Sequence, residues 1–155
     1  MNNLISLKKI SKNYILNNKV KALRNINFDF ELGKIYSIVG PSGSGKSTLL
    51  NIISLIDKPT SGNIKINGKL IDFNNHDLND KIRASSIGII YQNYNLLPDF
   101  TALENVSLAG LALNKNTKIS LNEARKIISN LGLSKRLDHF PSELSGGENQ
   151  RIAIA

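Results

Sequence analysis

The sequence contains no cysteine and only a single methionine among its 155 residues. The lack of cysteine excludes disulfide bonds and thiolate metal sites, which fits a reducing compartment. The most apolar stretch, VSLAGLAL at residues 106–113, is too short to cross a bilayer. The first residues show no basic segment followed by an apolar run, so they do not form a signal peptide. We therefore expect a cytoplasmic protein that reaches a membrane only through a partner.

Composition places the chain among ordinary soluble proteins. Hydrophobic residues make up 41% and charged residues 21% of the sequence, and the length favours one domain with a real core. The net charge of +8 raises the alternative of a nucleic-acid or lipid surface. The lysines are scattered, however, and no aromatic platform accompanies them. Biased codon usage explains the basic composition better, and we expect no nucleic-acid partner.

Several segments show the patterns of strands. NINFDFEL at residues 25–32 alternates apolar and polar side chains, as a half-buried strand does. KIYSIVG at 34–40 and SIGIIYQ at 86–92 are β-rich runs of the kind found in strands covered on both faces. GNIKINGK at 62–69 contains an Asn67-Gly68 turn and predicts a hairpin.

Other segments predict helices. KSTLLNIISLI at residues 46–56 has helical spacing, and its inward-facing side chains are expected to be Leu49, Leu50, Ile52, Ile53 and Ile56. From about residue 95 the sequence is helical in character, with predicted capping boxes at Thr101–Glu104 and Ser120–Glu123. Gly132 is expected to end the second of these helices. The overall pattern predicts an α/β nucleotide-binding core with a helical insertion after Gln92.

The segment GPSGSGKST at residues 40–48 carries the main chemical signal. It satisfies G-x-x-x-x-G-K-[ST] between a predicted strand and a predicted helix, which is the context that a phosphate-binding P-loop requires. Glycines let successive N–H groups point at one anion, and the helix N-terminus adds its positive end. Lys46 is assigned to the β- and γ-phosphates and the Ser47 hydroxyl to Mg²⁺. The alternative is a plain Gly/Ser-rich turn. The predicted nucleotide-binding residues of this segment are Gly40, Pro41, Ser42, Gly43, Ser44, Gly45, Lys46, Ser47 and Thr48.

A second motif, LSGGENQR at residues 144–151, resembles the signature of the ATP-binding cassette (ABC) ATPases. Ser145 and Glu148 form a third predicted capping box, and the two glycines leave the helix N-terminus bare as an anion site. The resemblance implies that this motif faces the ATP held by the other subunit of a head-to-tail dimer. The alternative is a capped helix with no ligand. The signature residues are Leu144, Ser145, Gly146, Gly147 and Glu148.

The same resemblance extends over the whole chain. It implies ATP and Mg²⁺ as cofactors, with Gln92 of IIYQ and Ser47 at the metal, and it matches Tyr14 of KNY to the aromatic residue that stacks on adenine. Packing is the alternative role for Tyr14. The implied fold is an α/β P-loop NTPase, with a RecA-like core, a β-subdomain and a helical ABC insertion. Its implied parts are a nucleotide-binding core at 1–92, a helical subdomain at 93–143 and the signature region at 144–155.

Within the family, the sequence is similar to the lipoprotein-releasing (LolD) subfamily, with MacB- and FtsE-type ATPases as close relatives. The similarity rests on YQNYNLLPDFTALENV, on FPSELSGGE and on the glutamate at position 148. It implies integral membrane partner subunits at the inner membrane that release lipoproteins. A patch of Leu96, Leu97 and Phe100 would dock those subunits, or would be tucked into the protein.

The resemblance also implies parts that this sequence does not show. In the family, a Walker B aspartate, a general-base glutamate and a switch histidine follow the signature, so we expect a C-terminally truncated cassette without a catalytic residue. His76 and His139 precede the signature and are interpreted as ordinary loop residues. Such a chain alone is expected to be marginally stable, aggregation-prone and nearly inactive as an ATPase. Two alternatives are a nucleotide-binding remnant without turnover and an ABC ATPase that works without membrane subunits.

Overall fold

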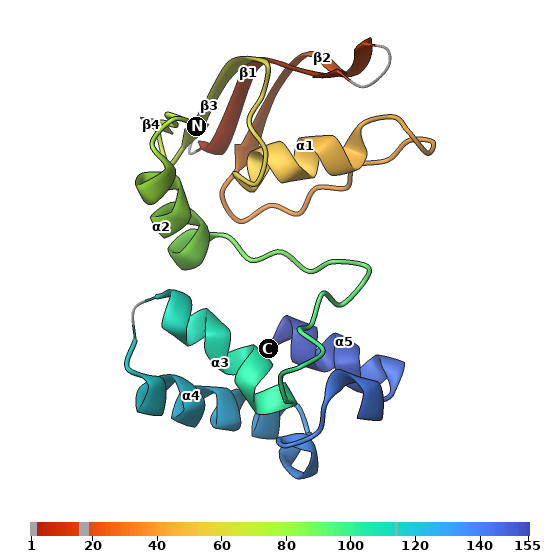
Figure 1. Cartoon of the computed structure of the whole chain (residues 1–155). Coiled ribbons are helices and arrows are strands. Elements are labelled where there is room, and N and C mark those ends of the chain that lie inside the picture. Colours follow the sequence, from red (N-terminus) through yellow and green to blue (C-terminus); the bar gives the residue numbers. More distant parts are fainter. Residues whose placement is uncertain (1–2, 16–18, 114) are drawn as a thin grey trace. The chain divides into compact units, whose positions relative to one another are not determined.

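The computed structural model describes residues 3–15, 19–113 and 115–155. The chain divides into two compact units, Met1–Arg83 and Ala84–Ala155. The first holds a sheet with helix α1 beside it, and the second is helical (Figure 1). The predicted subdivision at residues 92 and 143 stays a prediction.

An antiparallel sheet with the strand order β2-β1-β3-β4 forms the first unit. Its strands are β1 (Asn3–Ile15), β2 (Lys19–Glu31), β3 (Ser61–Ile66) and β4 (Lys69–Leu70). The predicted strand at 25–32 is confirmed as the second half of β2, and the predicted hairpin is confirmed as β3–β4. Asn67 and Gly68 both have positive φ, 50° and 75°, as a two-residue hairpin turn requires. One face of the sheet buries a core made of Leu7, Ile10, Leu23, Ile64 and Ile66.

Helix α1 (Lys46–Ile53) begins where the sequence predicts it. Ile52 is fully buried, and Leu55, just beyond the helix, is buried as well. The predicted inward face is wrong for Leu50 and Ile56, whose exposed fractions are 55% and 47%. The sheet lies on one side of α1 only, so side chains on the other side of the helix remain exposed. Ile56 lies beyond the end of the helix at Ile53, where helical spacing no longer applies.

The predicted covered strands at 34–40 and 86–92 are wrong for this structure. Neither segment forms a strand: residues 34–40 have no regular secondary structure, and residues 87–92 have none after Ser86, the last residue of a helix. Ile35 is 99% exposed. An interior strand needs neighbours that accept and donate its backbone hydrogen bonds, and the described residues place no strand beside either segment. The first segment is tied to β2 by Tyr36, whose hydroxyl accepts a hydrogen bond from the Glu31 amide at 2.9 Å.

Helices make up the second unit. Its elements are α3 (Ala102–Ala112), α4 (Thr117–Asn130), the short 3₁₀ helices η1 (Ser134–Arg136) and η2 (Pro141–Glu143), and α5 (Gly146–Ile154), while α2 (His76–Ser86) runs across the division between the units. Buried side chains from α3, α4 and α5 form one cluster that includes Val106, Ile128 and Ile152. In the described part of the chain, no helix has the length and apolar character needed to cross a membrane.

The ends of these helices confirm some of the predicted caps and correct one. Thr101 and Glu104 form the predicted capping box of α3, and Gly132, with φ of 75°, follows the end of α4 as predicted. The capping box predicted at Ser120–Glu123 is wrong, because α4 begins earlier, with Asn116 as its N-cap. Ser120 instead lies buried inside the helix, and its hydroxyl donates to the Asn116 carbonyl at 3.2 Å.

The core of the first unit yields a stability prediction from two isoleucines of β1. Ile10 is 0% exposed and Ile15 is 86% exposed. Ile10→Ala removes buried methyl groups and leaves a cavity, so it is expected to lower the free energy of unfolding by about 2–5 kcal/mol. Ile15→Ala is the matched control, with an expected change within about 0.5 kcal/mol. Urea denaturation measures both, and equal effects would contradict the assigned core.

Candidate functional site

The glycine-rich segment at 40–48 forms a tight loop that leads into α1. The Ser44 amide donates to the Pro41 carbonyl at 3.3 Å, which closes a turn. Gly43 and Gly45 have φ of 77° and 93°, values that side-chain-bearing residues rarely adopt. The sequence therefore folds locally into a curved backbone because glycines stand where the curve requires them.

Gly45 also allows the loop to approach the sheet. A Cβ atom at this position would lie 2.5 Å from the carbonyl oxygen of Ala22 and 3.0 Å from Cδ2 of Leu23, both in β2. Gly45 is the N-cap of α1 and offers no side chain to its amides. The first N–H groups of α1 therefore have no capping side chain, and together with the helix dipole they favour an anion at this end.

Lys46 supplies a cation at the same place. Its ammonium donates to the carbonyl oxygens of Gly40 at 2.9 Å and Pro41 at 2.8 Å, so it lies over the loop. Ser47 follows and is exposed. Its hydroxyl is a hard oxygen ligand of the kind that Mg²⁺ accepts beside phosphate oxygens, and the residues present therefore fit that ion. The loop thus combines backbone N–H groups, one cation and one metal-compatible hydroxyl.

The two remaining residues predicted for the nucleotide lie in different units. Tyr14 is in β1, and its hydroxyl donates to Oδ2 of Asp57 at 2.9 Å. The Lys12 ammonium lies 4.9 Å from the centre of the Tyr14 ring. Gln92 lies in the second unit, six residues after the end of α2. The roles of Tyr14 at adenine and Gln92 at Mg²⁺ stay predictions.

The signature segment forms the N-terminus of α5. Ser145 is the N-cap, its hydroxyl accepts from the Glu148 amide at 3.3 Å, and the Glu148 carboxylate accepts from the Ser145 amide at 2.8 Å. This is the predicted third capping box. Gly146 and Gly147 form the first turn, and a Cβ at Gly146 would lie 3.0 Å from the Tyr94 hydroxyl. Leu144 is buried in the core of the helical unit and anchors the segment.

Arg136 is a residue of this region that the sequence patterns did not single out. Its Nε donates to Oε1 of Glu148 at 2.8 Å, and its Nη1 lies 3.3 Å from Nε2 of His139. The hydrogen bond from the Ser145 amide, followed by that from Arg136, lowers the pKa of Glu148 to about 2. The carboxylate is therefore ionised at neutral pH. Only the fold joins residues twelve positions apart in this way, and a lone arginine gives no sequence signal for it.

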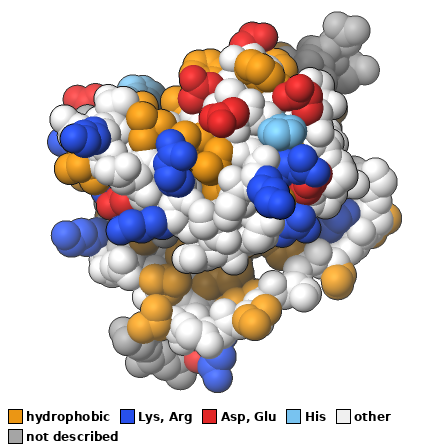
Figure 2. Space-filling view, turned by 90° about the horizontal axis from the view of Figure 1, so that it is seen from below, with side chains coloured by type: hydrophobic (Ala, Val, Ile, Leu, Met, Phe, Trp, Pro, Cys, Tyr) orange, Lys and Arg blue, Asp and Glu red, His pale blue; other side chains and the backbone are white. Residues whose placement is uncertain are grey.

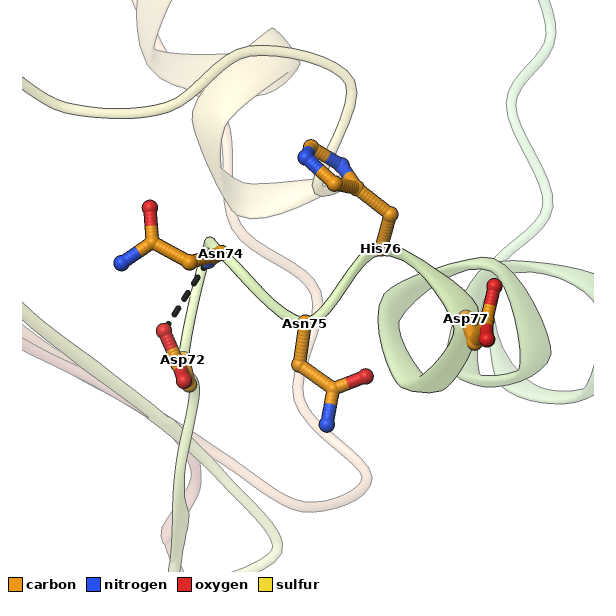
Figure 3. A pocket seen from close by; sticks show the side chains of 5 residues that line it. All are labelled: Asp72, Asn74, Asn75, His76 and Asp77. Carbon is orange, nitrogen blue, oxygen red and sulfur yellow. Dashed lines mark hydrogen bonds between the residues drawn. The ribbon is translucent and has the colours of Figure 1, made fainter.

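The hollows on the surface of the described residues include two that bear on ligand binding. One, of about 410 Å³, is lined by Gly132, Leu133, Ser134, Lys135, Arg136, Glu148 and Arg151. The other, of about 450 Å³, is lined by Asp72, Asn74, Asn75, His76 and Asp77 at the start of α2 (Figure 3). In this second hollow Asp72 accepts from the Asn74 amide at 2.9 Å, and Asn75 accepts from the Leu78 amide at 3.1 Å. Its acidic lining disfavours phosphate, and His76 points away from Asp72 (Figure 3).

Comparison with known protein families shows which family the chain, with both motifs, matches. A family model described as "ABC transporter" matches residues 23–155. The chain belongs to the ABC transporter family. The match covers the glycine-rich loop, the segment at 86–92 with Gln92 and the signature segment.

Curated members of the ABC family include close relatives of the chain. The lipoprotein-releasing system ATP-binding protein LolD of Rickettsia bellii is 44% identical over 155 residues, which cover 99% of this chain and 68% of the relative. LolD of Rickettsia typhi is 47% identical, with 99% and 68% covered. ABC transporter H family member 2 of Dictyostelium discoideum is 43% identical, with 99% of this chain but 30% of the relative covered.

Solved structures of ABC cassettes share the fold. The dimeric bacterial ABC transporter cassette MJ0796 matches with a TM-score of 0.85 and 39% identity, covering 97% of this chain and 67% of that one. The same cassette bound to ADP and Pi matches with a TM-score of 0.85 and 38% identity. These likenesses confirm the predicted P-loop NTPase fold class.

The lysines are scattered along the sequence, and the face in Figure 2 shows basic side chains interspersed with acidic, apolar and uncharged ones.

The lowered pKa of Glu148, the capping carboxylate of α5, predicts that the stability of the folded chain depends on pH. The pKa of Glu148 falls from 4.5 to about 2 in the folded chain, so its contribution to stability is complete above pH 4.5 and is lost as pH falls towards 2. Glu148→Gln removes the titrating group, so the free energy of unfolding is expected to fall less steeply over that range than in the wild type. Parallel curves for wild type and Glu148→Gln, from denaturation at several pH values, would contradict this prediction.

Proposed function

We propose that the chain is the ATP-binding and ATP-hydrolysing part of a transporter that releases lipoproteins from the inner membrane. The observation that carries the nucleotide site is the loop at 40–48. There, Gly45 packs against β2, the α1 amides have no capping side chain and Lys46 lies over the loop. These groups are the ones that a triphosphate needs.

Each group has a distinct task in this proposal. The loop amides and the α1 N-terminus bind the phosphates, and Lys46 exchanges its two carbonyl partners for phosphate oxygens. Ser47 holds Mg²⁺, which neutralises phosphate charge when bound. Tyr14 stacks on adenine, and Gln92 completes the metal site. Thr48, half-buried in α1, belongs to the same nucleotide-binding segment.

The signature segment contributes to a second nucleotide. In a head-to-tail dimer, the α5 N-terminus faces the γ-phosphate held by the other subunit. The description of MJ0796 as dimeric supports this arrangement. Because the Glu148 carboxylate already lies at that N-terminus, Arg136 compensates its charge and leaves the glycine amides able to attract phosphate.

The assignment to lipoprotein release rests on the relatives named LolD. They match nearly the whole chain at 44% and 47% identity. MacB-type export and FtsE-type ATPases are the alternatives. Integral membrane subunits would hold the protein at the cytoplasmic side of the inner membrane. Leu97 and Phe100 are exposed and offer them an apolar contact, whereas Leu96 packs against the helical core.

Turnover by the 155-residue chain alone is expected to be slow. The segment at 34–40 that leads into the loop is exposed and has no strand beside it in the described part of the chain. A phosphate site works best when its backbone is held rigid before the nucleotide arrives. We infer that this chain still binds nucleotide although it hydrolyses it slowly. Binding depends on the contacts of the loop with β2, and these lie within the first unit.

Lys46→Ala tests the nucleotide site. Removing the ammonium is expected to weaken ATP binding by about 10- to 100-fold, in line with the roughly 1.5–3 kcal/mol of a charged hydrogen bond. Calorimetric titration of the purified chain with ATP and Mg²⁺ measures the change. Lys34→Ala removes an exposed cation just before the loop and is expected to bind as the wild type does. Unchanged affinity in Lys46→Ala would remove the assignment.

Co-purification tests the transporter assignment. A tagged chain expressed with the membrane subunits of a lipoprotein-releasing system is expected to be recovered with them. Leu97→Asp places a charge in the exposed apolar contact and is expected to reduce recovery several-fold. Leu113→Asp, at a similarly exposed leucine at the end of α3, is the control. Recovery with MacB-type subunits alone would favour the alternative, and recovery with neither would reject the transporter role.

A further inference from the structure

Three side chains of the first unit form a compact polar cluster outside the glycine-rich loop. The Lys12 ammonium donates to Oδ1 of Asp57 at 2.6 Å and to the Lys58 carbonyl at 2.8 Å. The Tyr14 hydroxyl donates to the other carboxylate oxygen of Asp57 at 2.9 Å. The same ammonium lies 4.9 Å from the centre of the Tyr14 ring. Asp57 therefore binds the tyrosine and the cation beside it at the same time.

The cluster is connected to the loop through the sheet and through α1. Lys12 pairs with Leu23 in the β1–β2 ladder, and Leu23 is one of the two β2 residues that Gly45 approaches. Asp57 follows α1, and its amide donates to the Asn51 carbonyl at 3.1 Å. Tyr14 is thus held from two directions, by its own strand and by the helix that begins at the phosphate loop.

The charge of Asp57 determines which group donates the hydrogen bond between Asp57 and Tyr14. Burial raises the pKa of Asp57, but the hydrogen bonds from Lys12 and Tyr14 and the charge of Lys12 outweigh that effect, and the net pKa lies below its ordinary value. The carboxylate is therefore ionised at neutral pH and accepts from the Tyr14 hydroxyl. An aromatic side chain with a fixed hydroxyl loses its freedom to rotate about χ1 and χ2.

We propose that Asp57 is a positioning residue for adenine: it fixes the Tyr14 ring, with Lys12 against the ring, so that the platform for the base is formed before ATP arrives. This inference rests on the proposed function, in which Tyr14 stacks on adenine. A cation over one face of the ring is attracted by its π-electrons and leaves the other face for the base. Fixing the ring in advance removes an ordering cost from binding.

The test compares two ligands of the purified 155-residue chain, ATP and inorganic tripolyphosphate, each titrated with Mg²⁺. Tripolyphosphate carries the phosphates without the base. Asp57→Ala is expected to weaken ATP binding about three- to tenfold and to change tripolyphosphate binding less than about twofold. Tyr14→Ala is expected to weaken ATP binding about tenfold, again with tripolyphosphate binding nearly unchanged. Asp29→Ala, at an exposed aspartate of β2, is the control and is expected to affect neither ligand.

A double-mutant cycle separates positioning from a general role of Asp57 in stability. Tyr14→Phe keeps the ring but loses the hydroxyl, so it is expected to reproduce the ATP loss of Asp57→Ala. Tyr14→Phe combined with Asp57→Ala is then expected to cause no further loss. Additive losses, equal losses for ATP and tripolyphosphate, or unchanged ATP affinity in Asp57→Ala would each overturn the inference. If the wild type binds neither ligand, the proposed nucleotide site itself fails, which distinguishes the two failures.

Discussion

The close approach of Gly45 to β2 is the constraint on which the candidate site depends. A side chain at this position would collide with the Ala22 carbonyl oxygen, so the loop can lie against the sheet only with glycine there. This contact fixes where α1 starts, and the start of α1 determines where its free amides and Lys46 lie. The antiparallel sheet thus acts as the support of the phosphate loop.

Local patterns predicted the parts of the structure that local chemistry determines. The loop at 40–48, the β3–β4 hairpin and the capping boxes at Thr101 and Ser145 each depend on residues within a few positions of one another. The Ser120 prediction failed because the same pattern also suits a buried hydroxyl inside a helix. There, Ser120 lies against Gly110, where a Cβ would be 2.6 Å from its hydroxyl oxygen, and helix packing decides the outcome.

Features that depend on distant partners were beyond the sequence patterns. The runs at 34–40 and 86–92 have the composition of covered strands, yet a strand exists only where a neighbour shares its hydrogen bonds. The roles of Asp57 and Arg136 could not be predicted from the sequence either, because each side chain acts through a residue on another element. A pattern search finds the tyrosine and the signature glutamate, but only the fold shows which side chains hold them in place.

The two candidate anion-binding helix ends differ in electrostatic state. The α1 N-terminus has no capping side chain and is accompanied by a lysine, whereas the α5 N-terminus is capped by an ionised carboxylate that pairs with Arg136. The first end is suited to hold a phosphate by itself. At the second end, Arg136 already balances the negative charge of Glu148, so this end is suited to a phosphate that another group already holds.

The hydrogen bonds of Lys46 have a consequence for how the loop is occupied. Its ammonium is coordinated by the carbonyl oxygens of Gly40 and Pro41. Under the proposed function, an entering phosphate replaces these two carbonyl oxygens as the oxygen ligand of the ammonium. Because the departing ligands belong to the backbone, these two peptide groups change their surroundings whenever the exchange occurs. Occupancy of the loop can therefore be followed by spectroscopy at the carbonyl carbons of Gly40 and Pro41.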